Sequence, residues 1–387
     1  MSWTTAADIR AFVLRRWAQG NLLVPAAEQT FPWHVRCSRP TTRDLSDKFD
    51  EVRTWIRALY ESSAEQTGAG YTIDWVEVRH RQLGANRIPG GVAIPTLDDA
   101  LALIGKRKEY ERFQKLSALT EARIPQLSSW LVRRPLAALE HVNIWERLLM
   151  VVQWFCAHPR PEIYVRQIDL PGIDTKFVED NRNLLAELLD AALPTACVNP
   201  AATPRQFELR YGLRPKPSLV RFRILDPGMA LQGLTDIATP AAEFARLNLP
   251  VKRVFITENE INGLCFPAFS ESLVIFGLGF GLSRLSECQW LHHKSVVYWG
   301  DIDTHGFAML DRLRAILPQV QSLLMDEETL MLHQAHWVTE PQPHVGVLSR
   351  LTDVEQALYT GLSTQRFGIN VRLEQERIGY GWMQTRL

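Results

Sequence analysis

The 387-residue sequence has no long apolar run and no net charge. It contains no stretch of about 18 or more apolar residues, so we expect no membrane-spanning segment. Residues 1–8 lack a basic segment followed by an apolar core, which argues against a secretory signal. Lys plus Arg and Asp plus Glu each number 43, and this balance excludes a globally basic nucleic-acid binder. A local basic surface is still allowed, because the field that DNA feels depends on where the charge lies.

Cysteine is scarce and scattered. The five cysteines are Cys37, Cys156, Cys197, Cys265 and Cys288. They form no CxxC pair, so neither a zinc site nor a disulfide framework is indicated, and we expect reduced thiols in a cytoplasmic protein. The hydrophobic share of 46% and the charged share of 22% are ordinary for a soluble globular protein. The length allows two or three domains.

The first half of the chain, from about residue 5 to residue 190, is expected to be mainly helical. Apolar residues recur at helical spacing from Ile9 to Trp17 and from Phe49 to Leu59. The segment Trp145–Cys156 is apolar almost all round, which predicts a buried helix. Between them, Tyr71–Arg79 alternates in the manner of a strand. This half is therefore predicted to be an α+β region with a small sheet.

A stretch rich in proline follows this region and is predicted to be a linker or domain boundary. It runs from Leu193 to Pro204 and contains three prolines. Basic residues then gather in the next part of the chain: Arg210, Arg214, Lys216, Arg221 and Arg223. Such side chains are the candidates for contacts with DNA phosphates, which need Lys or Arg.

From residue 250 onward, strand patterns alternate with helix patterns. Strands are expected at 251–257, 273–276, 295–299 and 320–325. Helices are expected at 261–270, 283–292 and 307–317. This alternation predicts a parallel sheet with helices on its faces.

Acidic residues follow several of the expected strands. Glu258 and Glu260 follow the first, Asp301 and Asp303 follow the third, and Asp326 follows the fourth. In such sheets, functional groups gather at the carboxyl ends of the strands. Asp301 and Asp303 are two residues apart, so both point the same way in an extended chain. Neighbouring carboxylates repel each other and raise each other's pKa, and a divalent cation such as Mg²⁺ relieves this repulsion. With Glu258, the pair predicts a metal site able to bind a phosphodiester.

Two other interpretations of the acidic motif compete with a metal site. Asp303 or Thr304 also fits the cap of the helix that follows. The strand that ends in DxDxT also has the shape of the opening motif of haloacid dehalogenases, in which the first aspartate is a nucleophile. That motif normally starts its fold, however, and here little chain follows it. His305 is a candidate for holding a phosphate or moving a proton, although a lone histidine is more often structural.

The acidic motif resembles that of a known domain. A strand that ends in Ile-Thr-Glu258, and a later one that ends in Asp301-x-Asp303 with Gly306 after it, look like a Toprim domain, the fold of topoisomerases, primases and some nucleases. The Glu-Asn-Glu260 strand end is part of a more specific likeness.

The wider sequence resembles the JetD family, the nuclease subunits of Wadjet anti-plasmid defence systems. The motifs that carry this likeness are Glu258–Glu260, Arg372–Ile378, Phe31–Trp33, Asp47–Asp50 and Ile173–Phe177. They are spread over nearly the whole chain.

The resemblance implies an activity, a site and partners. Glu258, Asp301 and Asp303 would be catalytic residues that bind Mg²⁺ or Mn²⁺, with Glu260 and Asp326 as candidate further ligands. The likeness implies a helical arm or partner-binding domain at 1–195, a winged-helix-like DNA-binding region at 196–248 and a Toprim domain at 249–387. It further implies a homodimer that cleaves double-stranded plasmid DNA with a condensin-like complex of an SMC ATPase, a kleisin and an accessory subunit.

Two alternatives to a metal-dependent endonuclease stay open. The chain could be a non-catalytic DNA-binding or scaffold subunit of such a complex, whose acids hold only a structural ion. The similarity in layout to the topoisomerase VI A subunit also allows a tyrosine that attacks DNA. Tyr211 is the only tyrosine in the corresponding stretch, and it has no recognisable motif around it. We therefore favour metal-activated water as the nucleophile.

Overall fold

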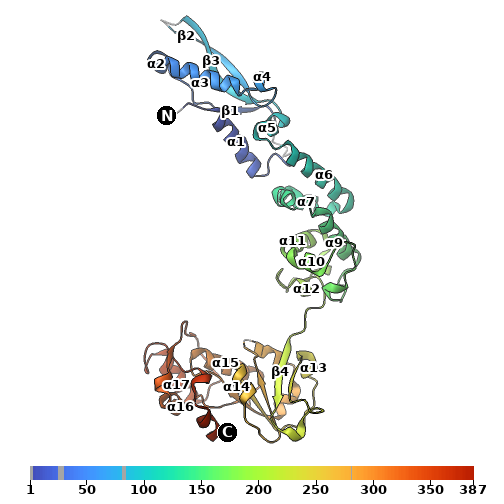
Figure 1. Cartoon of the computed structure of the whole chain (residues 1–387), viewed down its shortest axis with the longest axis vertical. Coiled ribbons are helices and arrows are strands. Elements are labelled where there is room, and N and C mark those ends of the chain that lie inside the picture. The colour runs from blue at the N-terminus through green and yellow to red at the C-terminus, as the bar shows by residue number, and fades with distance from the viewer. Residues whose placement is uncertain (1–2, 25–29, 81–83, 280) are drawn as a thin grey trace. The chain divides into compact units, whose positions relative to one another are not determined.

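The chain folds into two compact units, Met1–Pro215 and Lys216–Leu387 (Figure 1). Each unit has its own hydrophobic core. The structure is a computed structural model that describes residues 3–24, 30–80, 84–279 and 281–387. The core of the first unit draws on residues from Ile9 to Leu213. The core of the second draws on residues from Val220 to Met383. Each unit therefore buries its own apolar surface.

Helices build most of the first unit, as the apolar spacing predicts. α1 (Ala6–Ala18), α3 (Phe49–Glu61) and α9 (Trp145–Ala157) bury most of the predicted apolar positions, although Phe49 is exposed. The other helices are α2 (Thr42–Asp47), α4 (Ala64–Thr67), α5 (Leu97–Ile104), α6 (Arg107–Arg123), η1 (Pro125–Leu127), α7 (Ser128–Arg133), α8 (Pro135–Glu140), η2 (Val165–Gln167), α10 (Thr175–Asp180), α11 (Arg182–Ala192), η3 (Thr195–Cys197) and α12 (Phe207–Arg210). An antiparallel sheet of order β1-β3-β2 joins them, formed by β1 (Trp33–Val35), β2 (Thr72–His80) and β3 (Gly84–Ile94).

A six-stranded mixed sheet organises the second unit, in the order β5-β4-β7-β6-β8-β9. Its parallel part consists of β7 (Ser272–Phe276), β6 (Arg253–Thr257), β8 (Ser295–Trp299) and β9 (Gln321–Ser322). β6, β7 and β8 are short runs rich in β-branched and aromatic residues, which suit a sheet covered on both faces. The antiparallel part consists of β4 (Leu219–Ile224) and β5 (Asp236–Pro240). The expectation of a purely parallel sheet is thus corrected, because the basic segment before residue 250 extends the sheet.

The remaining elements of the second unit surround this sheet. They are η4 (Pro227–Met229), α13 (Ala241–Phe244), α14 (Glu260–Cys265), η5 (Gly281–Leu285), η6 (Gln289–His293), α15 (Thr304–Ile316), α16 (Glu327–Leu332), η7 (Gln334–His336), β10 (Val338–Thr339), α17 (Asp353–Ser363), β11 (Val371–Arg372), η8 (Gln375–Arg377) and α18 (Tyr380–Thr385). The helix expected at 283–292 is instead η5 and η6, two short 3-10 helices. Cys288 has non-helical backbone angles (φ −81°, ψ 73°), and the Ser286 hydroxyl donates to the Ser283 carbonyl (2.7 Å) in place of a continued helix.

The expected winged-helix-like region at 196–248 is not confirmed as a separate body. Residues up to Pro215 belong to the first unit, and those from Lys216 belong to the second. Phe207 lies in the first core, whereas Phe222 lies in the second. Among the described residues, no helix is both long enough and apolar enough to cross a membrane.

The order of the parallel strands creates a switch point in the second unit. From β6 the chain passes through α14 to β7 on one side, and from β8 it passes through α15 to β9 on the other. Because such crossovers are right-handed, α14 and α15 lie on opposite faces of the sheet. The carboxyl ends of β6 and β8 therefore meet where the direction of winding reverses, which is where ligands bind in sheets of this kind.

Candidate active site

Glu258 and Asp301 lie together at this switch point. Strands β6 and β8 are paired so that Thr257 lies beside Trp299, which places Glu258 beside Gly300. A Cβ atom at Gly300 would lie 2.9 Å from Glu258 Oε1, so the Glu258 side chain lies over the end of β8. The two acids line one polar pocket of about 190 Å³. Its other lining residues are Asn259, Arg372, Glu374 and Glu376.

Asp303 caps the helix that follows it. Its Oδ1 accepts a hydrogen bond from the backbone N–H of Gly306 (2.7 Å), so the interpretation as a helix cap is confirmed. The side chain is nevertheless buried (3% exposed), and its Oδ2 lies 3.0 Å from Arg372 Nε. Capping and a role in the acidic site are thus compatible. Gly306 is required here because a Cβ atom at this position would overlap the carbonyl oxygen of Asp301.

Arg372 bridges the acidic residues of the pocket. Its Nη2 lies 2.6 Å from Asp301 Oδ2, and its Nη1 lies 3.4 Å from Glu374 Oε1. It comes from β11, far along the chain from the aspartates. The sequence motif Arg372–Ile378 supported a family likeness but indicated no role in the site, because nothing local in it predicts a contact with the DxD loop.

Burial raises the pKa of two carboxyls in the site. It raises the pKa of Glu258 to about 7, with the charges of Asp301 and Asp303 adding to the effect and the hydrogen bond from the Tyr298 hydroxyl opposing it. Burial also raises the pKa of Asp303 to about 6, and the charge of Glu340 contributes. The raised pKa values mean that the ionised carboxylates are poorly stabilised by their surroundings. A bound cation would stabilise their charged forms.

Glu340 is an acid of this region that sequence reasoning missed. It is 2% exposed and follows β10. Its Oε1 accepts a hydrogen bond from the Thr304 hydroxyl (2.7 Å), and its carboxylate also receives the backbone N–H groups of Thr304 and His305 (3.3 Å each). It thus stabilises the first turn of α15. It follows no predicted strand of the main sheet, so no pattern signalled it.

The donor chemistry of the site fits a hard divalent cation. Glu258, Asp301 and Asp303 offer only oxygen atoms, which Mg²⁺ and Mn²⁺ prefer. The Glu258 carboxylate accepts a hydrogen bond from Tyr298, and the two aspartates form ion pairs with Arg372. Within the described ranges, no three His, Cys, Asp or Glu side chains are grouped to hold one ion. A cation at Asp301 and Asp303 would therefore compete with Arg372 for their oxygen atoms.

The other acids considered from sequence lie outside this pocket. Glu260 forms an ion pair with Arg221 and is exposed. Asp326 caps α16 by accepting the backbone N–H of Thr329 (2.7 Å). His305 is half-exposed, and its Nε2 lies 2.7 Å from the Gln342 carbonyl oxygen, to which it donates. The structure therefore brings Glu258 and Asp301 into one pocket and links Asp303 to Asp301 through Arg372. Glu260, Asp326 and His305 lie apart from this pocket.

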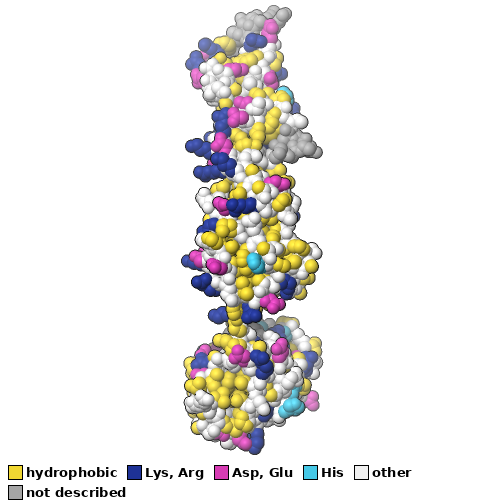
Figure 2. Space-filling view, turned by 90° about the vertical axis from the view of Figure 1, so that its right-hand side faces the viewer, with side chains coloured by type: hydrophobic (Ala, Val, Ile, Leu, Met, Phe, Trp, Pro, Cys, Tyr) yellow, Lys and Arg dark blue, Asp and Glu magenta, His cyan; other side chains and the backbone are white. Residues whose placement is uncertain are grey.

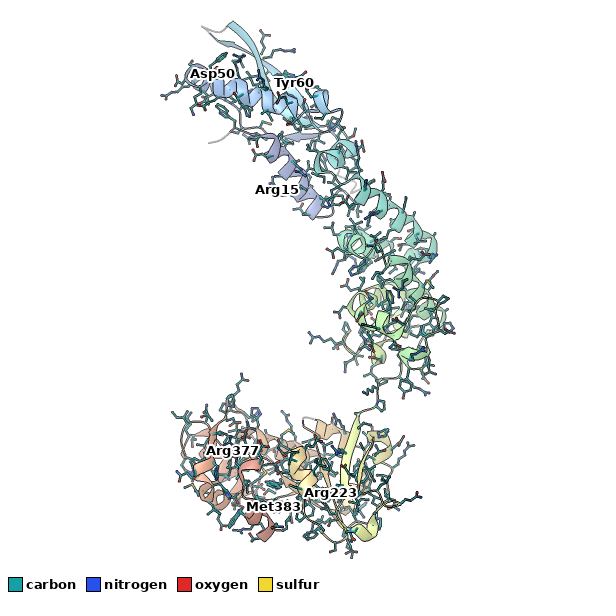
Figure 3. The ribbon with its side chains drawn as sticks, in the orientation of Figure 1. Arg15, Asp50, Tyr60, Arg223, Arg377 and Met383 are labelled. Carbon is teal, nitrogen blue, oxygen red and sulfur yellow. The ribbon has the colours of Figure 1, made fainter. Side chains whose placement is uncertain are left out.

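Three of the five arginine and lysine candidates for DNA contacts serve internal roles. Arg210 pairs with Asp190 (2.9 Å) and is 16% exposed. Arg221 pairs with Asp236 (2.7 Å) as well as with Glu260. Arg223, labelled in Figure 3, donates to carbonyls at the end of α14, including that of Gly263 (3.2 Å). These guanidinium groups hold the fold through ion pairs and hydrogen bonds. Their contact with a phosphate backbone stays a prediction.

Arg214 and Lys216 are the two candidates with exposed side chains. They flank Pro215, the last residue of the first unit. On the face drawn in Figure 2, Lys and Arg side chains are interspersed with Asp and Glu. Any basic surface on these units is therefore local.

Tyr211 is a structural residue of the first unit. It is 1% exposed and packs against Phe155 and Phe207. Its hydroxyl donates toward Asp190 Oδ1 (2.8 Å) and the Ala186 carbonyl (3.0 Å). Burial, reinforced by Asp190, raises the pKa of this hydroxyl well above its ordinary value. A buried phenol with a raised pKa is poorly suited to attack DNA.

Fold and pocket together define an α+β protein with a carboxylate pocket at the switch point of its sheet. Residues 212–387 match the family model described as Wadjet protein JetD, C-terminal. Residues 6–190 match the N-terminal model of an uncharacterized protein conserved in bacteria (DUF3322). The chain belongs to the JetD family of Wadjet proteins, as its motifs predicted. No curated protein matches it.

Proposed function

We propose that this chain is a metal-dependent DNA endonuclease of the Toprim type and the effector of a Wadjet system. The observation that carries the proposal is the meeting of Glu258 with Asp301 in one pocket at the switch point, beside the buried Asp303. Membership of the JetD family supplies the biological setting. The Toprim assignment is supported by the parallel core of four strands with acids at two of its carboxyl ends.

Different residues of the pocket would bind the metal ion, orient its ligands and bind the phosphate. Glu258, Asp301 and Asp303 would hold Mg²⁺ or Mn²⁺, which polarises a phosphodiester and lowers the pKa of water. The Tyr298 hydroxyl orients the Glu258 carboxylate by donating to its Oε1. Arg372 lines the same pocket, and its planar guanidinium is suited to bind a phosphate through two hydrogen bonds. Asp303 also fixes the start of α15, so the acidic loop is held on a regular element.

The proposed substrate is double-stranded plasmid DNA, contacted through its phosphates. Arg214 and Lys216 are exposed and supply two such contacts. We propose that the choice of substrate comes from partners, a condensin-like complex of an SMC ATPase, a kleisin and an accessory subunit, and that the chain acts as a homodimer. Equal cleavage of linear and circular DNA by the complete assembly would count against selection by topology.

The deciding experiment compares plasmid cleavage by the wild type, Glu258→Ala and Glu260→Ala with Mg²⁺ or Mn²⁺ and with the partner complex. Glu260 is the matched control, because it is an exposed glutamate two residues away that pairs with Arg221. We expect Glu258→Ala to lower cutting by at least about a hundredfold, because one of three carboxylates is lost, and Glu260→Ala to leave it nearly unchanged. Undiminished cutting by Glu258→Ala would refute the site. No cutting by any form would favour a non-catalytic scaffold.

A further inference from the structure

Gln375 joins the two strand ends that carry the acidic site. It is 1% exposed and begins the short helix η8, after β11. Its side-chain Oε1 accepts the Thr257 hydroxyl (3.0 Å) and the backbone N–H of Asn259 (3.0 Å), the two neighbours of Glu258. Its Nε2 donates to the carbonyl of Trp299, the last residue of β8. One amide group thus touches both strands.

The backbone of the same residue reaches the acidic loop directly. The N–H of Gln375 donates to Asp301 Oδ1 (2.9 Å), while Arg372 holds the other oxygen of this carboxylate. The segment is anchored by Leu373, whose backbone exchanges two hydrogen bonds with Ile302 (2.9 and 3.1 Å). Residues 372–375 therefore cross the carboxyl edge of the sheet and fix the conformation of the Asp301 side chain.

The primary amide satisfies all of these contacts at once. An amide carries donor and acceptor groups in one plane, whereas a carboxylate only accepts and an apolar side chain does neither. Without the amide, the Thr257 hydroxyl and the Trp299 carbonyl, whose hydrogen bonds to it are buried, lose their partner, which is unfavourable. Nothing else among the described contacts links the Thr257–Asn259 backbone to the Trp299 carbonyl through one side chain.

We propose that Gln375 is the positioning residue of the cation site: it sets the spacing between Glu258 on one strand end and Asp301 on the other. This inference rests on the proposed function, since it concerns the same carboxylates. Gln375 is not itself a ligand in this role. It acts as groups behind metal ligands do, by orienting the side chains that bind, and the loss of such groups typically weakens metal binding by about 10- to 100-fold.

The test measures Mn²⁺ binding to the full chain by titration calorimetry, together with thermal unfolding. Gln375→Met removes the amide at nearly constant volume. The matched control is Gln319→Met, because Gln319 donates to the carbonyls of Leu291 (2.8 Å) and Lys294 (3.5 Å) next to the start of β8, at the opposite edge of the sheet. We expect the Kd for Mn²⁺ to rise at least about tenfold in Gln375→Met and to stay within about twofold of the wild type in Gln319→Met.

A milder variant keeps the proposal testable if Gln375→Met does not fold. Thr257→Val keeps the side-chain shape and removes only the hydroxyl that donates to Gln375. We expect a Kd about three- to fivefold higher, in line with the loss of one supporting hydrogen bond. If Gln375→Met folds, a Kd for Mn²⁺ equal to that of the wild type would overturn the proposal. If Gln375→Met does not fold, an unchanged Kd in Thr257→Val would overturn it. A wild-type chain that binds no Mn²⁺ would instead overturn the proposed function.

Discussion

Asp303 serves two partners with its two oxygens. Oδ1 caps α15 through Gly306, and Oδ2 faces Arg372. The two roles separate by substitution, because asparagine is as good a helix cap as aspartate but carries no charge. We predict that Asp303→Asn keeps the wild-type unfolding free energy and loses Mn²⁺ binding and cutting, whereas Asp303→Ala also loses about 1 kcal/mol of stability. Urea unfolding and Mn²⁺ titration of both variants check this. Mn²⁺ binding by Asp303→Asn at wild-type affinity would contradict it.

Glu258 makes the stability of the metal-free protein depend on pH. Burial raises its pKa to about 7 from an ordinary value of 4.5. Between these values the folded protein binds more protons than the unfolded chain, so the free energy of unfolding falls as the pH rises. We predict a loss of on the order of 1–2 kcal/mol through Glu258 between about pH 5 and about pH 7.5, allowing for partial solvent screening.

Urea unfolding in EDTA across this pH range tests the effect, with Glu258→Gln as the comparison. The amide of the variant does not titrate, so its unfolding free energy should change less with pH than that of the wild type. Asp303, whose burial raises its pKa to about 6, titrates in both proteins, so the wild type should differ from the variant by the contribution of Glu258 and of its coupling to Asp303. Parallel curves for the two proteins would mean that the Glu258 carboxyl is not perturbed.

Among the secondary elements, those with a strong apolar pattern could be predicted from sequence, and those held by distant contacts could not. The strand at 295–299 was predicted with its bounds, because buried β-branched and aromatic residues dominate it. The expected strand at 320–325 shrinks to Gln321–Ser322, since pairing with β8 covers only those residues. The role of residues 372–375 was unpredictable, because their contacts are with residues some 70 positions away.

The start of α15 is built around Gly306, which gives a prediction for this element. A Cβ atom there would overlap the Asp301 carbonyl oxygen, which belongs to the backbone and cannot rotate away. We predict that Gly306→Ala lowers stability by about 1–3 kcal/mol, as overpacking does, and weakens Mn²⁺ binding by displacing Asp301. The measurements are thermal unfolding and Mn²⁺ titration.

Gly381→Ala is the matched control for this glycine. Gly381 lies in α18, and a Cβ atom there meets nothing within 4 Å. Because alanine favours helix over glycine by up to about 1 kcal/mol, this variant should be as stable as the wild type or more stable. Equal effects of the two substitutions would show that close packing at Gly306 is not what the loop requires.

At the scale of the whole molecule, the first unit ends in sequence at Pro215 rather than in the proline-rich stretch at 193–204. That stretch is folded into the first unit. The backbone N–H of Asn199 donates to the Arg210 carbonyl (2.9 Å), and Arg210 pairs with Asp190 on α11. Prolines mark turns as readily as linkers. Local composition therefore could not distinguish a folded turn region from the boundary between the units. The boundary depends on which hydrophobic core each side chain joins.

The separation of the cores predicts that residues 216–387 fold alone. Every residue of the second core, and each of Glu258, Asp301, Asp303, Arg372 and Gln375, lies in this segment. We predict that the isolated segment unfolds in one cooperative transition and binds Mn²⁺ within about threefold of the full chain, since the carboxylates and their supporting groups are all present. Its plasmid cutting should fall, because Arg214 and the whole first unit are missing.

Circular dichroism, Mn²⁺ titration and cleavage assays measure the three properties. A fragment that lacks cooperative unfolding would mean that the first unit stabilises the site. A fragment that folds but binds Mn²⁺ far more weakly would mean that the first unit contributes to the pocket itself.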